Sequence, residues 1–363
     1  MRLVVLTSEA ADVERGSGTA LAVRNLRAAL QSSGVATSVV QPRRIWPSQT
    51  YARSRFNHAH HDGAFTGIDA ALGVNGDGRR AAAAAGVPFV ALVKAFFAGA
   101  AEHERGLTRR VLQAHARWEA EGARGADEVV VPSRFAMTAV VAHYGVDPRR
   151  VNVIPEPFDL DAWRATLPLR ARNPHRVLCV AHLYPRKRVE DLVRAWPAVR
   201  RAVPDAHLDI AGAGPELHRI ARMARGLAGC FVHGHLEPRE VQELHARAGA
   251  FCLPSAQETF GYAVVEAMAT GLPVVVADAG ALPEITSGGV CSAVAEGDVG
   301  ALSAAVVAAL DTDVQERAAA VNPQRVAAFA PAAVARRLID VVTVAQAQRR
   351  AGGSESRAST SSR

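Results

Sequence analysis

The sequence predicts an α/β protein with two domains, each built on a parallel β-sheet between helices. Its 363 residues exceed the size at which one hydrophobic core usually stops growing. Short apolar runs alternate with longer amphipathic stretches along most of the chain, which is typical of repeated strand–helix units. A segment with four prolines, residues 151–174, interrupts this alternation and predicts a boundary between two such series.

The N-terminal series carries five expected strands, each a short run rich in Ala, Val, Leu or Phe. They lie at residues 3–6, 35–40, 70–74, 89–93 and 128–131, and helices are expected at residues 19–30, at 105–122 and from about Ser133. Residues 42–62 are rich in Arg, His and aromatic side chains and are expected to be irregular. This half predicts a Rossmann-like domain over residues 1–158.

The C-terminal series is more regular. Strands are expected at residues 177–181, 207–211, 230–233, 250–253, 273–277 and 290–293, with helices between them and one or two more at 326–346. A second Rossmann-like domain is therefore expected over residues 159–345, with room for its C-terminal helix to pack back on the first domain. The low-complexity tail, residues 346–363, is expected to be disordered.

Composition excludes several function classes. The net charge is +7, but no long basic run is interleaved with aromatic residues, so no nucleic-acid partner is expected. The four cysteines form no CxxC pair, which argues against a metal site and favours free thiols in a reducing compartment. No apolar run reaches the 18 residues of a membrane span, and the N-terminal apolar run is too short for a signal peptide. A cytoplasmic protein is therefore expected, with membrane contact not favoured.

The strongest motif is PSAQETFGYAVVEAMATGLPVVVAD, which follows an expected strand. Its first part is a loop with Glu258, and a helix opens near Gly261 and carries Glu266 about one turn later. Ligands of parallel sheets bind at the carboxyl ends of strands, and the first turn of a helix offers free N–H groups to a phosphate or sugar. Both carboxylates can therefore reach one ligand lying across this helix N-terminus.

This motif resembles the Glu-x7-Glu element of the family-4 retaining glycosyltransferases, almost position for position. The resemblance implies the GT-B fold, in which two Rossmann-like domains face each other across a cleft. It implies that Glu258 holds hydroxyls of the donor sugar and that Glu266 holds the ribose. The residues between them that line the donor site would be Thr259, Phe260, Gly261 and Tyr262.

A second element, VAHLYPRKRVEDLVRAWPAV, resembles the strand and loop with which the family clamps the donor diphosphate. Lys187 falls on the family's lysine. His182 falls on the family's arginine, a departure for which Arg186 or Arg188 would compensate. AGAGPELHRI and ALPEI also match family segments, so the resemblance covers nearly all of residues 176–310.

The N-terminal half resembles the family more loosely. Gly16 and Gly18 match a glycine-rich loop near the donor phosphates, and Leu21 at the third glycine position argues against a dinucleotide-binding dehydrogenase. Lys94 stands where many members carry an active-site histidine that faces the donor sugar. VIPEPFDLDAW resembles the family's I-P-N-G-V-D hinge, with Glu156 and Pro157 in place of Asn-Gly. Lys94 and Lys187 are the two lysines of a chain with forty arginines, and both fall at expected site positions.

The resemblance implies a metal-independent hexosyltransferase with no tightly bound cofactor. It would move a sugar from a nucleotide-diphosphate sugar, UDP favoured and GDP next, to a hydroxyl of a small-molecule or glycan acceptor in bacterial glycoconjugate or secondary-metabolite biosynthesis. The alternative is a non-catalytic sugar-nucleotide-binding homologue or partner subunit, because His182 and Lys94 depart from the family. An epimerase or phosphorylase fits less well, since no lysine for a pyridoxal Schiff base lies near the C-terminal site.

Two features of the N-terminal half indicate opposite acceptor charges. The arginines of residues 42–62, which are Arg43, Arg44, Arg53 and Arg55, favour a phosphate- or carboxylate-bearing acceptor. Asp77, in a turn after an expected strand, favours hydroxyls or an amine. Both alternatives stay open at the level of sequence, as does a solvated loop with no acceptor role.

Overall fold

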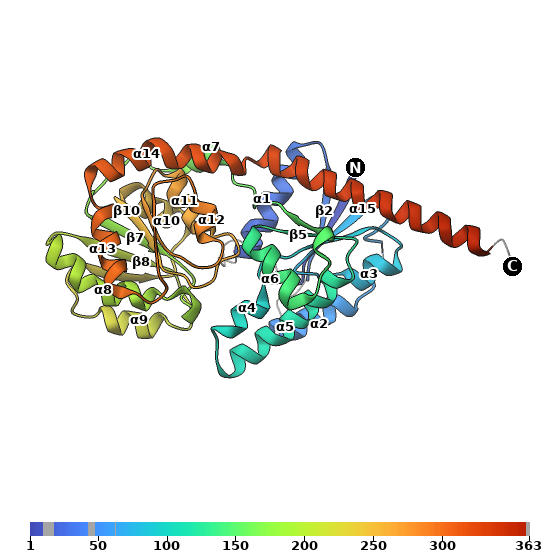
Figure 1. The fold of residues 1–363 in the computed structure, drawn as a ribbon, viewed down its shortest axis with the longest axis horizontal. Helices are drawn as coiled ribbons and strands as arrows, with labels where there is room; N and C mark the ends of the chain where they lie inside the picture. The colour runs from blue at the N-terminus through green and yellow to red at the C-terminus, as the bar shows by residue number, and fades with distance from the viewer. Residues whose placement is uncertain (10–17, 43–47, 62, 361–363) are drawn as a thin grey trace. The chain divides into compact units, whose positions relative to one another are not determined.

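The computed structural model describes residues 1–9, 18–42, 48–61 and 63–360, with side chains to residue 351. The chain divides into two compact units. The first unit comprises Met1–Pro157 and Pro331–Arg363, and the second comprises Phe158–Ala330. Each unit holds one six-stranded sheet in which every pair of neighbouring strands is parallel (Figure 1).

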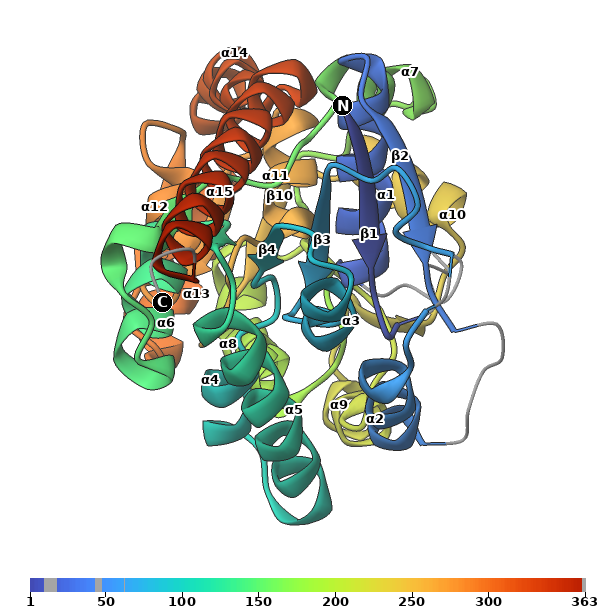
Figure 2. The same ribbon diagram turned by 90° about the vertical axis from the view of Figure 1, so that its right-hand side faces the viewer.

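The sheet of the first unit has the strand order β2-β1-β3-β4-β5-β6, of which Figure 2 shows the first four in sequence. The strands are β1 (Arg2–Leu6), β2 (Ala36–Val40), β3 (Ala70–Val74), β4 (Phe89–Leu92), β5 (Glu128–Val131) and β6 (Val151–Val153). The helices are α1 (Gly18–Ser32), α2 (Gln49–His58), α3 (Arg79–Ala84), α4 (Phe97–Glu102), α5 (Gly106–Arg124), α6 (Arg134–Tyr144), the 3-10 turn η2 (Pro148–Arg150) and α15 (Pro331–Thr360). The order reverses between β1 and β3, so the loops after these two strands diverge.

Side chains that alternate along β1 build a core on each face of this sheet. Leu3 and Val5 belong to one cluster, which also contains residues of α1 and α15. Val4 and Leu6 belong to the other, which contains residues of α5 and α6. Both faces are apolar because parallel strands are covered by helices on both sides.

The C-terminal helix α15 is part of the first unit. Leu338, only 1% exposed, lies in the cluster that α15 shares with α1 and the sheet. Arg337 Nη2 donates to the Val153 carbonyl at 2.6 Å, and Gln346 Nε2 donates to the Asp69 carbonyl at 3.1 Å. The helix continues to Thr360, through most of the tail for which composition indicated disorder.

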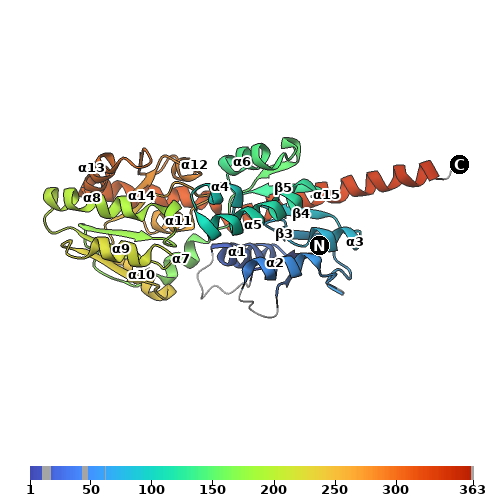
Figure 3. The same cartoon turned by 90° about the horizontal axis from the view of Figure 1, so that it is seen from below.

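The sheet of the second unit has the order β12-β11-β10-β7-β8-β9, which reverses between β7 and β10. Its strands are β7 (Arg176–Val180), β8 (His207–Ala211), β9 (Cys230–Gly234), β10 (Ala250–Leu253), β11 (Val274–Ala277) and β12 (Cys291–Val294). Its helices are α7 (Leu160–Thr166), α8 (Val189–Ala202), α9 (Leu217–Ala224), α10 (Pro238–Arg247), α11 (Tyr262–Ala269), α12 (Leu282–Thr286), α13 (Val299–Ala309) and α14 (Thr312–Val326), with 3-10 turns η3 (Pro185–Lys187) and η4 (Ala327–Phe329). Helices α8 and α13 pack side by side (Figure 3).

One expectation about local structure is wrong. Part of the segment expected to be irregular, residues 42–62, forms α2. The Ser48 side chain caps this helix by accepting from the Tyr51 N–H, and its inner face carries Arg53 beside Phe56, both buried. A buried arginine on the inner face hides the apolar periodicity by which a helix is recognised in sequence.

Within the described part of the chain, none of the helices combines the length and the apolar character needed to span a bilayer.

The packing of α15 predicts unequal costs for two truncations on the same helix. Leu338→Ala removes a 1%-exposed side chain from the core and should lower the free energy of unfolding of the first unit by about 2–5 kcal/mol. Val344→Ala, at a 49%-exposed position of α15, should change it by no more than about 0.5 kcal/mol. Hydrogen–deuterium exchange of β1 and β3 peptides measures both. Equal protection in the two variants would show that α15 does not stabilise the first unit.

Candidate functional site

Lys187 and Glu258 meet where the strand order of the second unit reverses. Lys187 ends η3 in the loop after β7, and Glu258 lies in the loop after β10. Lys187 Nζ donates to Glu258 Oε1, and the two side chains are 14% and 13% exposed. The sequence-predicted cation and carboxylate therefore form one pair at the carboxyl edge of the sheet, where parallel α/β sheets bind ligands.

Backbone hydrogen bonds hold the loop with Glu258 against the loop after β7 and against the segment before α12. The Arg186 carbonyl accepts from the Ala256 N–H at 2.8 Å, and the Glu258 carbonyl accepts from the Ala281 N–H at 2.9 Å. Gly280 has φ 61°, and a Cβ there would come within 2.8 Å of the Glu258 backbone. The position of Glu258 is thus set by main-chain contacts and by a glycine that allows close approach.

Glu266 lies on α11, the helix that follows this loop. Gly261 caps the helix with φ 90°, a conformation that glycine adopts without steric cost. The Glu266 carbonyl accepts from Thr270 Oγ1 at 2.8 Å, which fixes the second turn of α11. The Glu266 side chain is 17% exposed.

The residues between the two glutamates differ in what they can offer a ligand. Thr259 and Tyr262 are partly exposed. Phe260 is 3% exposed and packs against the rings of Tyr262 and Phe329, with 5.2 Å between ring centroids in each case. Phe260 can therefore contribute only its backbone to ligand binding, while its ring anchors the start of α11.

The basic residues after β7 have separate partners. His182 is exposed, and the Arg186 guanidinium lies 4.4 Å from the centre of the Tyr184 ring. Arg188 donates from Nε to Asp191 at 2.7 Å and from Nη1 to Glu296 at 3.0 Å. Arg188, one of the two arginines expected to compensate for His182, is therefore held by two carboxylates of its own unit.

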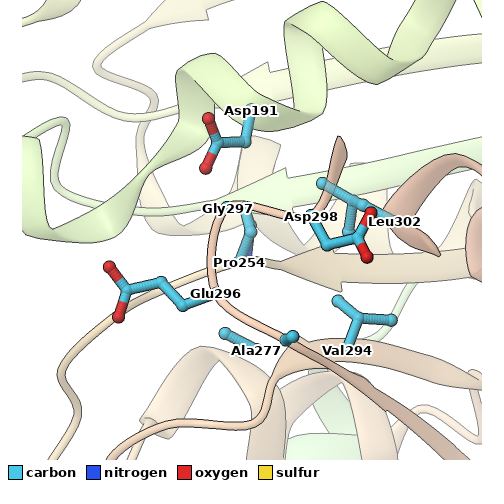
Figure 4. A pocket seen from close by; sticks show the side chains of 9 residues that line it. Asp191, Pro254, Ala277, Val294, Glu296, Gly297, Asp298 and Leu302 are labelled. Atoms are coloured by element: carbon cyan, nitrogen blue, oxygen red, sulfur yellow. The ribbon is translucent and has the colours of Figure 1, made fainter. Parts of the chain in front are cut away.

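A small pocket adjoins the carboxylates that hold Arg188. Its floor includes Pro254, Ala277 and Val294, at the carboxyl ends of β10, β11 and β12. Asp191 and Glu296 line it from α8 and from the loop after β12 (Figure 4). The pocket extends the polar edge of the sheet beyond the Lys187–Glu258 pair.

Two glycines let the turn after β8 approach the loop that carries His182. Gly212 has φ 137° and Gly214 has φ 155°. A Cβ on Gly212 would lie 1.8 Å from the Ala181 carbonyl oxygen, and one on Gly214 would lie 2.6 Å from that of Leu183. The family-like G-x-G-P-E turn is therefore a packing requirement of this unit.

Lys94 lies in the first unit, two residues beyond the end of β4. The Asn75 side-chain oxygen accepts from the N–H groups of Lys94 and Ala95, at 2.9 and 3.1 Å. Asn75 has φ 51°, a left-handed conformation that Asn tolerates better than most residues. Lys94 Nζ lies 2.6 Å from both carboxylate oxygens of Glu156.

The interpretation of Arg53 and Asp77 as acceptor-binding side chains is wrong. Arg53 Nε donates to Asp77 Oδ1 at 2.9 Å, and both side chains are 3% exposed. Asp77 Oδ2 also accepts from the Ser8 N–H at 2.7 Å, and Arg53 Nη2 donates to the Asn75 carbonyl. The two side chains that indicated opposite acceptor charges therefore neutralise each other, and Arg53 also supports the Asn75 turn.

The structure describes only some of the other residues expected near the acceptor or the donor phosphates. Gly16, Arg43 and Arg44 lie outside the described residues. Gly18 is the exposed first residue of α1, and Arg55 is exposed on α2.

Two family models match the chain, one to each half. The model described as Glycosyltransferase Family 4 matches residues 58–162, and the model described as Glycosyl transferases group 1 matches residues 174–312. Together they cover 105 and 139 residues, or 244 of the 363. The chain belongs to the family-4 glycosyltransferases.

Curated relatives of this family-4 chain match part of their length. The GDP-mannose-dependent alpha-(1-6)-phosphatidylinositol monomannoside mannosyltransferase of Mycolicibacterium smegmatis is 33% identical over 201 residues, covering 50% of this chain and 52% of the relative. A glycogen synthase of Mycobacterium tuberculosis is 33% identical over 196 residues, covering 52% of this chain and 46% of the relative. The chain therefore spans about half the length of the curated relatives it matches.

Solved structures confirm the two-domain GT-B fold predicted for this family. Sucrose-phosphate synthase from Thermosynechococcus elongatus matches with a TM-score of 0.74 at 19% identity, covering 94% of this chain and 98% of that one. Anabaena Alr3699/HepE in complex with UDP and glucose matches with a TM-score of 0.68 at 17% identity, covering 94% and 99%. At these identities the likeness concerns the fold.

His245 is a buried residue beside the glycosyltransferase motif that sequence patterns do not indicate. It is 0% exposed on α10, and its Nε2 lies 4.0 Å from Glu266 Oε2. Its ring packs edge-on against Trp163 at 5.3 Å and stacks on Phe251 at 6.0 Å. Among the described residues neither ring nitrogen has a hydrogen-bond partner, and burial lowers the pKa of His245 to about 3. The sequence could not predict that His245 lies beside Glu266, because a single histidine in a helix does not indicate what its ring contacts.

The first unit also contains a buried titratable residue, Glu119. It accepts from the Tyr144 hydroxyl and from the Phe97 N–H, and it is 0% exposed. Burial raises its pKa to about 7, although these hydrogen bonds act in the opposite direction. Nearby His115 has its pKa lowered to about 4, first by burial and second by Arg53. His115 contacts Arg53, which donates to the Asn75 carbonyl, and Glu119 accepts from the Phe97 N–H in the segment after Lys94.

The buried neutral His245 predicts that acid destabilises the second unit. Below pH 6.5 the unfolded chain protonates this imidazole while the folded protein does not, so stability falls as the pH drops from 6.5 toward 3. Between pH 7.5 and 4.5 the loss is about 2–3 kcal/mol at 1.36 kcal/mol per pH unit. His245→Phe should remove this loss, as measured by hydrogen exchange of α10 and α11 peptides at the two pH values.

Exposed His218 on α9 supplies the matched control, because His218→Phe should leave the pH dependence as in the wild type. An unchanged pH dependence in His245→Phe would mean that the imidazole is already protonated in the folded protein.

Proposed function

We propose that this protein is a retaining glycosyltransferase that moves a sugar from a nucleoside-diphosphate sugar to a hydroxyl of its acceptor. One observation carries the proposal. Lys187 and Glu258 form an ion pair at the carboxyl edge of one sheet, at the reversal of its strand order, and the loop with Glu258 leads into the N-terminus of α11, the helix that carries Glu266. A cation, two carboxylates and a helix N-terminus together suit an anionic leaving group attached to a polyhydroxylated sugar.

Lys187 binds the donor diphosphate in this proposal. Without donor, the ammonium is neutralised by Glu258, which keeps a nearly buried charge paired. A bound diphosphate competes for Nζ through charge-assisted hydrogen bonds and stabilises the charge that develops when the phosphate leaves. Arg186 and the first turn of α11 add positive potential on the same side.

The two glutamates divide the remaining donor contacts. Glu266, set one turn into α11, accepts from the ribose hydroxyls. Glu258, released from Lys187 when the diphosphate binds, accepts from hydroxyls of the transferred sugar. Neither carboxylate needs to attack the sugar, so both act as binding groups.

Transfer with retention then needs no nucleophile from the protein. The bond between sugar C1 and the phosphate oxygen breaks, and the acceptor oxygen bonds to C1 on the same face. The leaving phosphate oxygen takes the proton of the acceptor hydroxyl, so atoms and charge balance. The protein contributes by orienting the two reactants and by stabilising the leaving diphosphate.

UDP-sugars and GDP-sugars are the donors that the comparisons support. HepE is bound to UDP and glucose, and the M. smegmatis relative is named as GDP-mannose-dependent. A small-molecule or glycan acceptor in bacterial glycoconjugate or secondary-metabolite synthesis completes the proposal. A cytoplasmic site of action fits the four cysteines, all of which are free.

Lys187→Ala should reduce turnover by about tenfold or more, because one charge-assisted contact to the diphosphate contributes about 1.5–3 kcal/mol. Release of UDP or GDP from a panel of sugar nucleotides measures turnover, and thermal melting checks the fold. Arg222→Ala removes an exposed cation from α9 of the same unit and should have no effect. Turnover near the wild-type rate in Lys187→Ala would exclude Lys187 from the donor site.

Glu266→Gln should weaken the binding of free UDP or GDP, since it alters the ribose contact. Glu258→Gln should leave that affinity close to wild type and chiefly reduce transfer. Isothermal calorimetry with the nucleotide and a product assay separate the two effects, and Glu316→Gln, exposed on α14, serves as control. If both variants lost nucleotide affinity equally, the division between ribose and sugar would be wrong.

Hydrolysis of the donor by the wild-type protein, without acceptor, separates this function from a non-catalytic sugar-nucleotide-binding homologue. A homologue without catalysis would bind the nucleotide and release none.

A further inference from the structure

The two departures from the family pattern in the first unit are each other's partners. Lys94 takes the place of the family's histidine, and Glu156 takes the place of the hinge asparagine. They lie 62 residues apart in sequence, yet Lys94 Nζ is 2.6 Å from both oxygens of the Glu156 carboxylate. The side chains are 10% and 5% exposed, so the contact is a nearly buried ion pair.

The pair spans the carboxyl end of one strand. Lys94 follows β4 and Glu156 follows β6, and β5 lies between these two strands in the sheet. The ion pair therefore crosses the edge at which parallel sheets bind their ligands, above the point where β5 leads into α6. Two hydrogen bonds to Asn75 Oδ1 fix the Lys94 end of the pair.

Stability alone is a poor reason for this arrangement. Removing two charges from water costs about as much as their mutual attraction returns, so a buried pair is weak evidence of a stabilising role. The chain carries forty arginines and two lysines, and here it uses the compact ammonium. The opposite charges instead leave a neutral pair that presents hydrogen-bonding groups at the carboxyl edge of the sheet.

The chemistry of the pair selects its ligand. A lone lysine would attract phosphate or carboxylate, and a lone glutamate would attract a cation, whereas the pair has no net charge. A carboxylate offers about four lone-pair sites, and Lys94 occupies two of those on Glu156. A hydroxyl, which both donates and accepts, fits this combination better than an ion does.

We propose that Lys94 and Glu156 together form a sugar-hydroxyl-binding pair that replaces a single imidazole, with Glu156 as a specificity-determining residue. The inference rests on the proposed function, because the sugar belongs to either the donor or the acceptor of the transfer reaction. Glu156 accepts from a sugar hydroxyl, and Lys94 holds its carboxylate in place.

The experiment compares three variants in the full chain. Glu156→Gln and Lys94→His should each lower kcat/KM for transfer about tenfold or more, while the affinity for free UDP or GDP stays at the wild-type value. The double variant Lys94→His/Glu156→Asn, which restores the family pattern at both positions, should recover to within about threefold of wild type. Asp147→Asn breaks the exposed Asp147–Arg149 pair of the same unit and should change neither quantity.

Deoxy-sugar substrates test whether a hydroxyl is the ligand. One donor or acceptor lacking a hydroxyl should be a poorer substrate for the wild type but no poorer than its parent for Glu156→Gln. If that substrate is a donor analogue, donor hydrolysis without acceptor falls in the variants as well. If it is an acceptor analogue, hydrolysis persists and only transfer falls.

Two results would overturn the inference. Single variants that keep wild-type kinetics, or that lose activity only in proportion to a lower melting temperature with no change in deoxy-sugar discrimination, would reduce the pair to a structural contact. In that case Lys187→Ala would still reduce turnover by about tenfold or more, so the proposed function would stand. A wild-type protein that neither hydrolyses nor transfers from any UDP- or GDP-sugar would overturn both.

Discussion

Parallel strands place every strand's carboxyl end at one edge of the sheet, and the reversal of strand order makes two neighbouring loops diverge at that edge. In the second unit these are the loops after β7 and β10, which carry Lys187 and Glu258. The strand side chains are mostly apolar and buried, so the polar side chains of the candidate site lie in the loops at this edge. Everything that defines the site, including the start of α11, depends on this constraint.

The site is held in place mainly by backbone contacts. A bond to the Arg186 carbonyl joins the two loops, and a bond from the Ala281 N–H to the Glu258 carbonyl ties the second loop to the segment before α12. Glycines at positions 212, 214 and 280 allow main-chain segments to approach closer than a Cβ would permit. The loops that carry Lys187 and Glu258 are therefore positioned by main-chain contacts. Such preorganisation lowers the cost of ordering groups when a charged substrate binds.

The first unit differs from the second in that it buries charged side chains near the carboxyl ends of its strands. Arg53 with Asp77 and Lys94 with Glu156 are nearly buried ion pairs, and Glu119 is a buried acid with a raised pKa. Each pair keeps a charge from being left alone in a medium of low dielectric constant, which would be costly. Together they support the Asn75 turn and the segment after β4, so the electrostatics of this unit fix the shape of its loops.

The sequence by itself determined the parallel α/β class, the six strands of the second unit and the motif residues Lys187, Glu258 and Glu266. These features are local, because strand periodicity and loop–helix motifs lie within about 25 consecutive residues. Only the tertiary structure decided that Arg53 pairs with Asp77, that Lys94 pairs with Glu156, that His245 lies beside Glu266, and that α15 completes the first unit. Such contacts join residues 21 to more than 200 positions apart, and their partners depend on strand order, which no local pattern encodes.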